Sequence, residues 1–327
     1  MKAVYIKEFG GPENLEIREV PDPPKPSGTK VLVRVRAAAL NRADLLQRMG
    51  KYPPPAGYSP NIPGMEFAGE VAEVGDEVRQ FKKGDRVFAI TGGEAQAEYL
   101  LIDERLLAPV PDNLSLADAA AVPEVFITAD DAIFTLGHLT AGESILIHAV
   151  GSGVGLAALQ LAKAKGAKVF GTSRTQDKLD RCREFGLDVP ILAEQPTFAE
   201  SVLRETEGQG VDVVLDLVGA AYFKENLASL AIKGRMVLVG TQAGSKAEFD
   251  FGAVMYKRLT IIGTVLRARP FEEKVLVNQR FIEEVVPLLA GGEVKPNVDK
   301  VFPADQIRTA HEYMQSNASF GKIVIEF

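Results

Sequence analysis

Apolar and polar positions divide the chain into a β-rich first part and a later part in which strands and helices alternate. The first part contains short runs of apolar and β-branched residues bounded by turn-forming Gly, Pro or Asp, as is typical of β-strands. Ser115 can cap a helix over residues 116–121, with Asp118 completing a capping box. Strands are expected at residues 1–5, 15–20, 31–39, 71–74, 86–90 and 98–102.

The later part repeats strand and helix in turn, which predicts a doubly wound parallel sheet of the α/β class. Residues 275–289 and the strand-like 323–325 do not extend this alternation, so the end of the chain is expected to return to the β-rich domain. Helices are expected at residues 156–163, 178–185, 198–205 and 222–230. Strands are expected at residues 144–149, 167–172, 189–192, 211–217, 236–239 and 259–266.

Residues 143–173 have the form of a dinucleotide-binding β-α-β unit. An apolar strand ends at the turn Val150-Gly151-Ser152-Gly153-Val154-Gly155, and an apolar helix and a second strand follow it. Glycines in such a turn let the backbone approach a pyrophosphate, and the free N–H groups at the helix start face its negative charge. The segment therefore indicates a cofactor-binding enzyme.

The glycine spacing by itself is weaker evidence, because two registers compete. The register that begins at Gly151 fails at its third glycine, where Leu156 stands. The register that ends at Gly155 has Val150 and Ser152 at its first two positions. In that second register Gly155 would allow the close helix–strand contact. The alternative is an ordinary glycine-rich turn between a strand and a helix.

The end of the second strand bears on the type of cofactor. An NAD site usually has an acid there for the ribose hydroxyls, while an NADP site offers cationic or hydroxyl groups to a 2′-phosphate. This chain has Thr172-Ser173-Arg174 and then Lys178, with no acid before Asp177. Arg174 and Lys178 are also compatible with an ordinary solvated surface, but the missing acid favours NADPH.

Composition limits the class of protein. At 327 residues the chain exceeds one ordinary domain, so two domains are expected. No apolar run reaches the ~18 to 20 residues of a membrane span, and a net charge of -7 argues against a nucleic-acid partner. The only cysteine, Cys182, cannot form an internal disulfide, and no signal peptide is expected, since residues 1–5 read as a strand. A cytoplasmic protein without a membrane partner is expected.

Several stretches fit the pattern of one known family. They are Phe-Gly-Gly-Pro-Glu at 9–13, Ala-Leu-Asn-Arg-Ala-Asp at 39–44, Gly-Asp-Arg-Val at 84–87, His-Ala at 148–149 and Gly-Lys-Ile-Val at 321–324. Over essentially its full length the chain resembles the zinc-free quinone oxidoreductases of the medium-chain dehydrogenase/reductase superfamily. Within that family, Ala-Ala-Ala-Val-Pro-Glu at 119–124 and Ser-Gly-Val-Gly at 152–155 look closest to the tumour-suppressor-inducible branch.

The resemblance implies a GroES-like catalytic domain made from both chain ends, residues 1–124 and 267–327, with a Rossmann domain, residues 125–266, inserted in it. NADPH would bind to the Rossmann domain, in the cleft between the two domains, where the hydride transfer would take place. Homodimers are common in the family and often form along the edge strands of the Rossmann sheets, which corresponds to residues 259–266 here. An exposed apolar edge strand needs such a cover.

Zinc is not expected, although many relatives of the family use it. A zinc site needs several Cys and His ligands, and Met65 stands where zinc-dependent relatives have a ligating His. A four-cysteine structural site is impossible with one cysteine. His138, His148 and His311 are spread along the chain and are interpreted as ordinary core or surface residues.

The resemblance also implies the residues of the site. Tyr52 and Asn41 would lie near the nicotinamide and the substrate, and Asp44 would support their loop. Tyr52 is also compatible with a packing role, and Asn41 with a structural one. Cofactor contacts are implied at Thr128, Ser152, Gly153, Val154, Ser173, Lys178, Gly240, Thr241, Leu266, Arg267, Asn317 and Lys322, to which the strand end adds Arg174.

Some positions depart from the family's pattern. Ala193 replaces a tyrosine that often flanks the 2′-phosphate region, and Asn317 stands where some members have an arginine. Both changes weaken the prediction of NADPH. Asp130 and Asp131 occupy positions that are usually apolar or aromatic.

Three functions are compatible with these residues. The first is NADPH-dependent reduction of quinones, in which a hydride acceptor delocalises the incoming electrons onto oxygen without help from a metal. The second is reduction of an activated C=C bond in an enal or enone, which would use the same pocket. The third is a binding protein that retains NADPH with little turnover, as in the lens crystallins that arose from this family.

Overall fold

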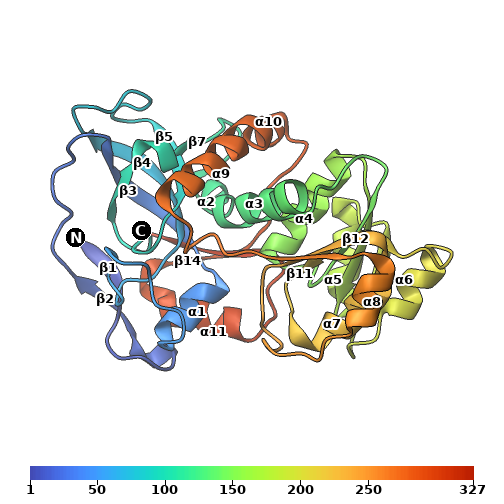
Figure 1. Cartoon of the computed structure of the whole chain (residues 1–327). Coiled ribbons are helices and arrows are strands. Elements are labelled where there is room, and N and C mark those ends of the chain that lie inside the picture. The colour runs from blue at the N-terminus through green and yellow to red at the C-terminus, as the bar shows by residue number, and fades with distance from the viewer. The chain divides into compact units, whose positions relative to one another are not determined.

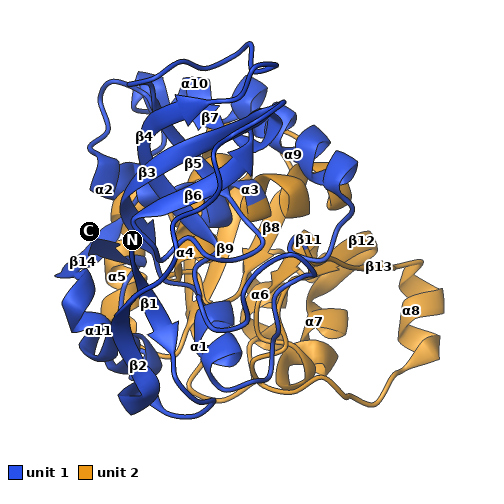
Figure 2. Ribbon diagram, turned by 90° about the vertical axis from the view of Figure 1, so that its left-hand side faces the viewer, with its two compact units in different colours: residues 1–127, 266–327 blue, residues 128–265 orange.

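The computed structural model describes residues 1–327 and divides them into two compact units. Unit 1 consists of residues 1–127 and 266–327, and unit 2 of residues 128–265 (Figure 2). Both ends of the chain belong to unit 1 (Figure 2). The return of the final segment to the β-rich part, expected from the break in alternation, is therefore confirmed.

Unit 1 is built mainly from antiparallel strands. Its strands are β1 Lys2–Ile6, β2 Leu15–Glu19, β3 Lys30–Ala39, β4 Glu66–Val74, β5 Arg86–Ile90, β6 Tyr99–Asp103, β7 Ala108–Pro109, β14 Val298–Pro303 and β15 Lys322–Glu326. Its helices are α1 Arg42–Arg48, α2 Leu116–Ala120, α9 Phe271–Glu284, α10 Val286–Gly291 and α11 Ile307–Gln315, while α3 Pro123–Asp130 crosses into unit 2.

The main sheet of unit 1 joins strands from both ends of the chain. Its order is β14-β15-β3-β4-β5-β7, and β6 also pairs with β3. The last strand, β15, pairs antiparallel with β3 through Val324 opposite Ala39 and Ile325 opposite Ala38. β1 and β2 form a separate antiparallel pair. The pairing of β15 with β3 brings Lys322, at the start of β15, close to the loop that follows β3.

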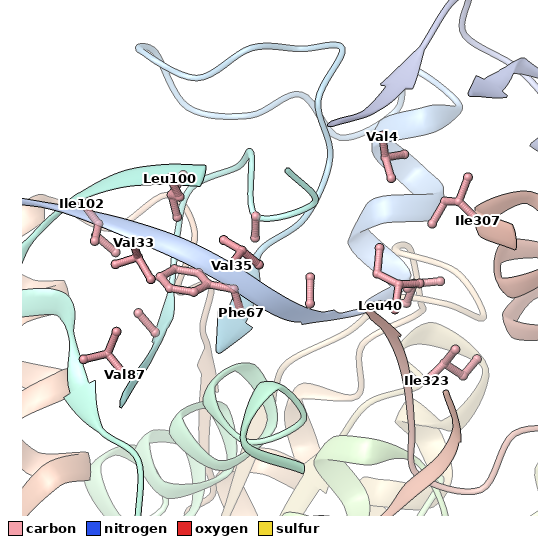
Figure 3. Close-up of a cluster of buried hydrophobic side chains, with 14 of the residues drawn as sticks. Val4, Val33, Val35, Leu40, Phe67, Val87, Leu100, Ile102, Ile307 and Ile323 are labelled. Carbon is pink, nitrogen blue, oxygen red and sulfur yellow. The ribbon is translucent and has the colours of Figure 1, made fainter. Parts of the chain in front are cut away.

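The core of unit 1 gathers the apolar faces of these strands (Figure 3). The alternating burial of β3 follows from its Lys-Val-Leu-Val-Arg-Val sequence, because successive side chains of a strand point to opposite faces. Figure 3 shows part of this cluster: Val33 and Val35 of β3, Phe67 of β4, Val87 of β5, Leu100 and Ile102 of β6, Ile307 of α11 and Ile323 of β15.

Unit 2 alternates strands with helices along the chain (Figure 1). Its strands are β8 Ser144–Ile147, β9 Lys168–Ser173, β10 Val189–Leu192, β11 Val211–Asp216, β12 Leu230–Leu238 and β13 Thr260–Gly263. Its helices are α4 Gly153–Ala164, α5 Gln176–Cys182, α6 Ala199–Glu205, α7 Phe223–Ser229 and α8 Phe251–Lys257, and a π-helix spans Asp131–Leu136.

The six strands of unit 2 form one sheet in the order β10-β9-β8-β11-β12-β13. Every neighbouring pair is parallel. The order reverses between β8 and β11, which is the switch point where doubly wound sheets bind ligands at the carboxyl ends of their strands. The doubly wound sheet predicted from the alternation is confirmed.

Several helices were not predicted from the sequence pattern: α1, α3 and α8, and also α9, α10 and α11 in the last part of the chain. α1 and α8 have seven residues each, too few for a clear helical period. The stretch from α3 through the π-helix is mostly apolar, with charged side chains only at Glu124 and at buried Asp130 and Asp131, so it has no clear polar face to reveal a helix. The predicted edge strand 259–266 is shorter in the structure, where β13 covers Thr260–Gly263.

None of the helices has the length and apolar character required to cross a membrane.

Candidate active site

The strand-to-helix turn of unit 2 has the features of a phosphate-binding turn. Ser152 caps α4, because its Oγ atom accepts the N–H of Gly155 at 3.1 Å. A Cβ atom on Gly155 would lie 2.5 Å from the carbonyl oxygen of Ala149, so only glycine permits this close approach, as predicted. The first N–H groups of a helix have no carbonyl partner within it. Gly153 and Val154, both partly exposed, can therefore present N–H groups to a pyrophosphate, while the N–H of Ser152 donates to Ala149 O at 2.8 Å.

Other residues predicted to contact the cofactor lie along the same edge of the unit 2 sheet. Ser173 ends β9, while Gly240 and Thr241 follow β12. The carboxyl ends of parallel strands meet at one edge, and β8 leads into the Ser152 turn at that edge. Thr128 belongs to α3 and is buried.

The end of β9 offers polar and cationic groups. Ser173 is largely buried, and its Oγ atom accepts the N–H of Thr175 at 3.3 Å. Arg174 is exposed, and Lys178 on α5 is partly exposed. The strand therefore ends in hydroxyl and cationic side chains, which suit a phosphate better than a ribose hydroxyl.

A buried polar network beneath this edge was missed by the sequence reasoning, which interpreted His148 as an ordinary residue. The Nδ1 atom of His148 lies 2.9 Å from Thr172 Oγ1, and its Nε2 atom lies 2.6 Å from Asn226 Oδ1. Asn226 Nδ2 donates to Asp216 Oδ2 at 3.0 Å. Asp216 Oδ1 accepts the N–H groups of Val218 and Gly219.

This network fixes the protonation of His148. The bond from Asn226 Nδ2 to the Asp216 carboxylate leaves Asn226 Oδ1 as an acceptor, so His148 donates from Nε2 and accepts from Thr172 at Nδ1. Burial lowers the pKa of His148 to about 4, so the ring is neutral at pH 7. The neutral ring of His148, which follows β8, thus contacts Thr172 of β9 directly and Asp216 of β11 through Asn226.

A second buried network lies in unit 1, around Lys322 at the start of β15. The Lys322 Nζ atom donates to Leu40 O, Asn41 Oδ1 and Glu66 Oε1, each at 2.7 Å. Asn41 Nδ2 also donates to Glu66 Oε1, at 2.9 Å. The side chains of Lys322 and Glu66 are buried, so the three protons of the ammonium are all used inside the protein.

Asp44 holds the loop between β3 and α1. Its Oδ2 atom accepts the N–H of Asn41 at 2.8 Å, which forms a capping box at the start of α1. Its Oδ1 atom accepts the N–H of Gly64 at 3.1 Å. Burial raises the pKa of the Asp44 carboxyl to about 6, against the opposing effect of these N–H groups and of Lys322 and Arg267. The supporting role implied for Asp44 agrees with these contacts.

Arg267 joins the Tyr52 loop to the rest of unit 1. Its Nη1 atom donates to Tyr52 O at 3.3 Å, Nη2 to Gln47 Oε1 at 2.7 Å, and Nε to Gly92 O at 2.8 Å. Its guanidinium carbon lies 5.0 Å from the centroid of the Tyr52 ring. Burial raises the pKa of the Tyr52 phenol, the Arg267 charge opposes this, and Glu124 adds to it. Arg267 thus bonds three protein oxygens and positions Tyr52.

The remaining two residues predicted for the cofactor lie in the last part of unit 1. Leu266 is partly exposed at the start of that part. Asn317 is exposed, has a left-handed backbone with φ of 60°, and accepts a hydrogen bond from Arg42 Nη2. The predicted residues thus fall into two groups. Unit 1 contains Asn41, Tyr52, Leu266, Arg267, Asn317 and Lys322, and unit 2 contains Thr128, Ser152, Gly153, Val154, Ser173, Arg174, Lys178, Gly240 and Thr241.

Sequence reasoning assigned no role to two acids of unit 1. Glu66, the first residue of β4, bonds Lys322 and Asn41, and its Oε2 atom accepts the N–H of Glu124 at 2.8 Å. Glu124 is the second residue of α3, and its Oε2 atom is buried without a hydrogen-bond partner. In the sequence, Glu124 ends the family stretch at 119–124 and Glu66 follows Met65, but no local pattern marks either acid as a site residue.

No group of three or more His, Cys, Asp and Glu side chains is placed to hold a metal ion. Met65 is buried. His148 is bonded as described above, His311 is buried with its Nδ1 atom 3.3 Å from Arg48 Nη1, and His138 is exposed. The three histidines therefore have separate surroundings.

Comparison with known proteins extends over both units. Residues 27–112 match the family described as alcohol dehydrogenase GroES-like domain, and residues 153–282 match the family described as zinc-binding dehydrogenase. The quinone oxidoreductase of Rattus norvegicus is 31% identical over 329 residues, which cover 99% of this chain and 97% of the relative.

Solved structures agree with this relationship. The Escherichia coli quinone oxidoreductase complexed with NADPH superimposes with a TM-score of 0.89 at 29% identity, covering 100% of both chains. The JamJ enoyl reductase in its apo form superimposes with a TM-score of 0.89 at 27% identity, covering 99% of this chain and 98% of that one. These similarities confirm the predicted fold class, a GroES-like β-rich domain combined with a Rossmann sheet.

Proposed function

This chain belongs to the medium-chain dehydrogenase/reductase superfamily, and we propose that it reduces quinones with NADPH without using a metal ion. The observation that carries the proposal is that no set of side chains is placed to bind a metal, although one matching family is described as zinc-binding. Without a Lewis acid, the hydride acceptor must delocalise the incoming electrons onto its own oxygen. Quinones do this, and relatives at about 31% identity are quinone oxidoreductases.

The residues of unit 2 fit NADPH. The Ser152 turn offers helix N–H groups to the pyrophosphate, and Gly155 allows the backbone to approach closely. Ser173, Arg174 and Lys178 would hold the 2′-phosphate, since β9 ends without an acid. NADPH supplies the hydride when bound. A similar protein of Escherichia coli was crystallised with NADPH, which supports this choice.

The role we assign to unit 1 is to position the substrate. Tyr52 would pack against the substrate ring, held in place by the cation of Arg267 beside its own ring. Asn41 is fixed by Lys322, Glu66 and Asp44, so its orientation is already set before a substrate binds. Preorganised groups of this kind reduce the cost of orienting the reactants.

The proposal is tested by measuring NADPH oxidation against ortho-quinones, para-quinones and enals, with detection of semiquinone to separate one-electron from two-electron reduction. We expect quinones to be the best substrates and the activity to persist in a chelator. The purified protein should contain no stoichiometric zinc. A stoichiometric metal that is required for turnover would contradict the proposal, as would NADPH binding without oxidation by any quinone.

Reduction of an activated C=C bond is the second candidate. The observation in its favour is the structural similarity to an enoyl reductase over nearly the whole chain. The same substrate panel separates the two functions, because an enal or enone would then show a higher kcat/KM than any quinone.

We also propose that the protein forms a homodimer through the edge of the unit 2 sheet. β13 pairs only with β12, so its other edge has unpaired backbone groups. The adjoining α8 exposes large apolar side chains: Phe251 is 71% exposed, Met255 76% and Tyr256 81%. A patch of this kind is typical of a protein–protein contact, and a second copy of the chain can pair β13 with β13 and cover α8.

A further inference from the structure

The carboxyl of Glu124 lies in the buried acid cluster of unit 1 and has no assigned role. We propose that Glu124 holds, in protonated form, the proton that the reduction consumes and delivers it to the reduced substrate. This inference rests on the proposed function. It starts from the position of Glu124 on the first turn of α3, where its own N–H is bonded to Glu66 Oε2 at 2.8 Å.

The cations near Glu124 are already used by other groups. Lys322 donates its three protons to Leu40 O, Asn41 Oδ1 and Glu66 Oε1. Arg267 donates to three other oxygens, on Gly92, Tyr52 and Gln47. Glu124 Oε2 is buried and accepts nothing. Glu124 as a whole is partly exposed, but an ionised Glu124 would place charge on this buried oxygen without a bonded counter-charge, which is more costly than a neutral acid.

The charges of the cluster balance when Glu124 is neutral. The groups that act on it electrostatically are Glu66 of β4, Lys322 of β15, Asp44 of α1 and Arg267 of the segment after β13. With Glu66 and Asp44 ionised, the two carboxylates match the two cations. Burial, reinforced by the charges of Glu66 and Asp44, raises the pKa of Glu124 to about 8. The acid therefore carries its proton at pH 7.

Glu124 also lies within electrostatic range of Tyr52, the side chain to which we assign substrate positioning. Its charge contributes to raising the pKa of the Tyr52 phenol. It likewise acts on Arg267, which lies beside the Tyr52 ring. A protonated carboxyl whose Oε2 atom has no hydrogen-bond partner, within electrostatic range of the side chain that we assign to substrate positioning, is a suitable general acid, since its pKa is close to the working pH.

The proposed step is balanced in atoms and electrons. A quinone that takes up the hydride and its electron pair becomes a hydroquinone anion. The O–H bond of Glu124 then breaks, a new O–H bond forms on the anionic oxygen, and Glu124 is left as a carboxylate. Water returns a proton to Glu124 before the next turnover. With an enal as substrate, the same proton would form a C–H bond at the α-carbon of the enolate.

The decisive variant is Glu124→Gln, which keeps the size of the side chain and a neutral charge but has no acidic proton. We expect kcat with a quinone to fall about 10²-fold, the lower end of what a general acid contributes, while the Kd for NADPH stays unchanged. In the wild type kcat should fall as the pH rises through about 8, because Glu124 loses its proton there. This fall should be absent from the variant.

Two further variants serve as controls. Glu124→Asp retains an acidic proton and should regain part of the lost turnover. Glu104→Gln removes a carboxylate that is also buried in unit 1, where it accepts the N–H groups of Arg79 and Gln80. It should leave kcat and its pH profile unchanged. Equal loss in Glu124→Gln and Glu124→Asp would show a purely structural role and would overturn the proposal.

Stability provides a readout that does not depend on turnover. Because folding raises the pKa of Glu124 from 4.5 to about 8, its contribution to stability is complete below pH 4.5 and is lost as the pH rises to about 8. The unfolding temperature of the wild type should therefore fall relative to Glu124→Gln across this interval. A constant difference would show that Glu124 is not protonated and would overturn the proposal, even if quinone reduction itself is absent. An active wild type with unchanged turnover in Glu124→Gln would overturn the proton-donor role alone.

Discussion

For single residues, the hydrogen bonds that a side chain makes inside the protein distinguish side chains that can contact a ligand from side chains that position other residues. Lys322 and Arg267 were both predicted to contact the cofactor. Each is buried and donates three hydrogen bonds to protein oxygens. Their structural contribution is to fix Asn41 and Tyr52. Arg174 and Lys178, in contrast, are at least partly exposed and accessible to a phosphate.

The role of Tyr52 is open to a direct test. We predict that Tyr52→Phe keeps most of the turnover with a quinone, because the developing charge is delocalised over the substrate and Tyr52 only positions it. Tyr52→Ala should chiefly raise the substrate KM, since it removes the ring. Steady-state kinetics with a quinone and an enal measure both effects.

The alternative is that the Tyr52 hydroxyl takes part in the reaction itself. If Tyr52 donates a proton or a hydrogen bond in the transition state, Tyr52→Phe should lose about 10²-fold in kcat with cofactor binding intact. Such a loss with a quinone would contradict the positioning role. A loss confined to enals would favour C=C reduction, because an enolate needs more stabilisation than a hydroquinone anion.

Lys178 tests the preference for NADPH. A 2′-phosphate paired with a partly exposed cation should gain about 1 to 3 kcal/mol from charge-assisted hydrogen bonds. Lys178→Ala should therefore raise the KM for NADPH and leave the KM for NADH nearly unchanged. Lys168→Ala is the matched control, because Lys168 is an exposed lysine at the opposite end of β9. Equal weakening of both cofactors would show that Lys178 acts on the fold or the pyrophosphate.

At the scale of elements, the cofactor turn depends on how closely α4 approaches β8. The Ser152 cap sets the start of the helix, and the neutral His148 ties the carboxyl ends of β8, β9 and β11 together beneath it. Buried networks in which every member is satisfied make a local structure rigid. The close backbone contact at Gly155 and the polar network around His148 therefore both fix the conformation of the turn.

Gly155→Ala should disturb this turn. The new methyl group would lie 2.5 Å from Ala149 O and 2.7 Å from Val150 Cα, so the backbone has to shift. We expect the free energy of unfolding to fall by about 1 to 3 kcal/mol, as for other overpacked sites, and the Kd for NADPH to rise. Gly291→Ala is the control, since a methyl group there meets only Glu293 Oε1, at 3.7 Å. Unchanged NADPH affinity in Gly155→Ala, measured by calorimetry, would contradict the assigned role of the turn.

At the scale of the whole molecule, the exposed surface of unit 2 predicts association. β13 and α8 combine an unpaired sheet edge with Phe251, Met255 and Tyr256, all more than two-thirds exposed. We predict a dimer in solution by sedimentation velocity, and a monomer for the double variant Met255→Glu with Tyr256→Glu. Charges placed in an apolar contact cannot be paired when the two copies associate.

The matched control is Leu276→Glu on α9. Leu276 is also an exposed apolar side chain, at 64%, but it belongs to unit 1. This variant should sediment as the wild type does. A wild type that sediments as a monomer, or a dimer that persists in the double variant, would contradict the proposed interface.

Features that depend on neighbouring residues could be predicted from the amino-acid sequence. The Ser115 and Ser152 caps and the alternation of strands and helices in unit 2 all follow from local hydrogen-bonding chemistry and from periods of 2.0 and 3.6 residues. The fold class followed from them, because that alternation is typical of a doubly wound sheet. The short helices α1 and α8 were missed, since they are stabilised by packing rather than by a visible period.

Contacts between side chains that are distant in the sequence depend on the folded arrangement of the strands. Asn41 and Lys322 are 281 positions apart, and Glu66 and Glu124 are 58 apart, yet they share one buried network because β15 pairs with β3. The cost of an unpaired buried charge depends on which donors remain available after folding. No local pattern could show that the donors of Lys322 are used by other groups while Glu124 Oε2 has no partner. The sequence determined the kind of protein, and the fold decided the protonation and bonding of its buried polar groups.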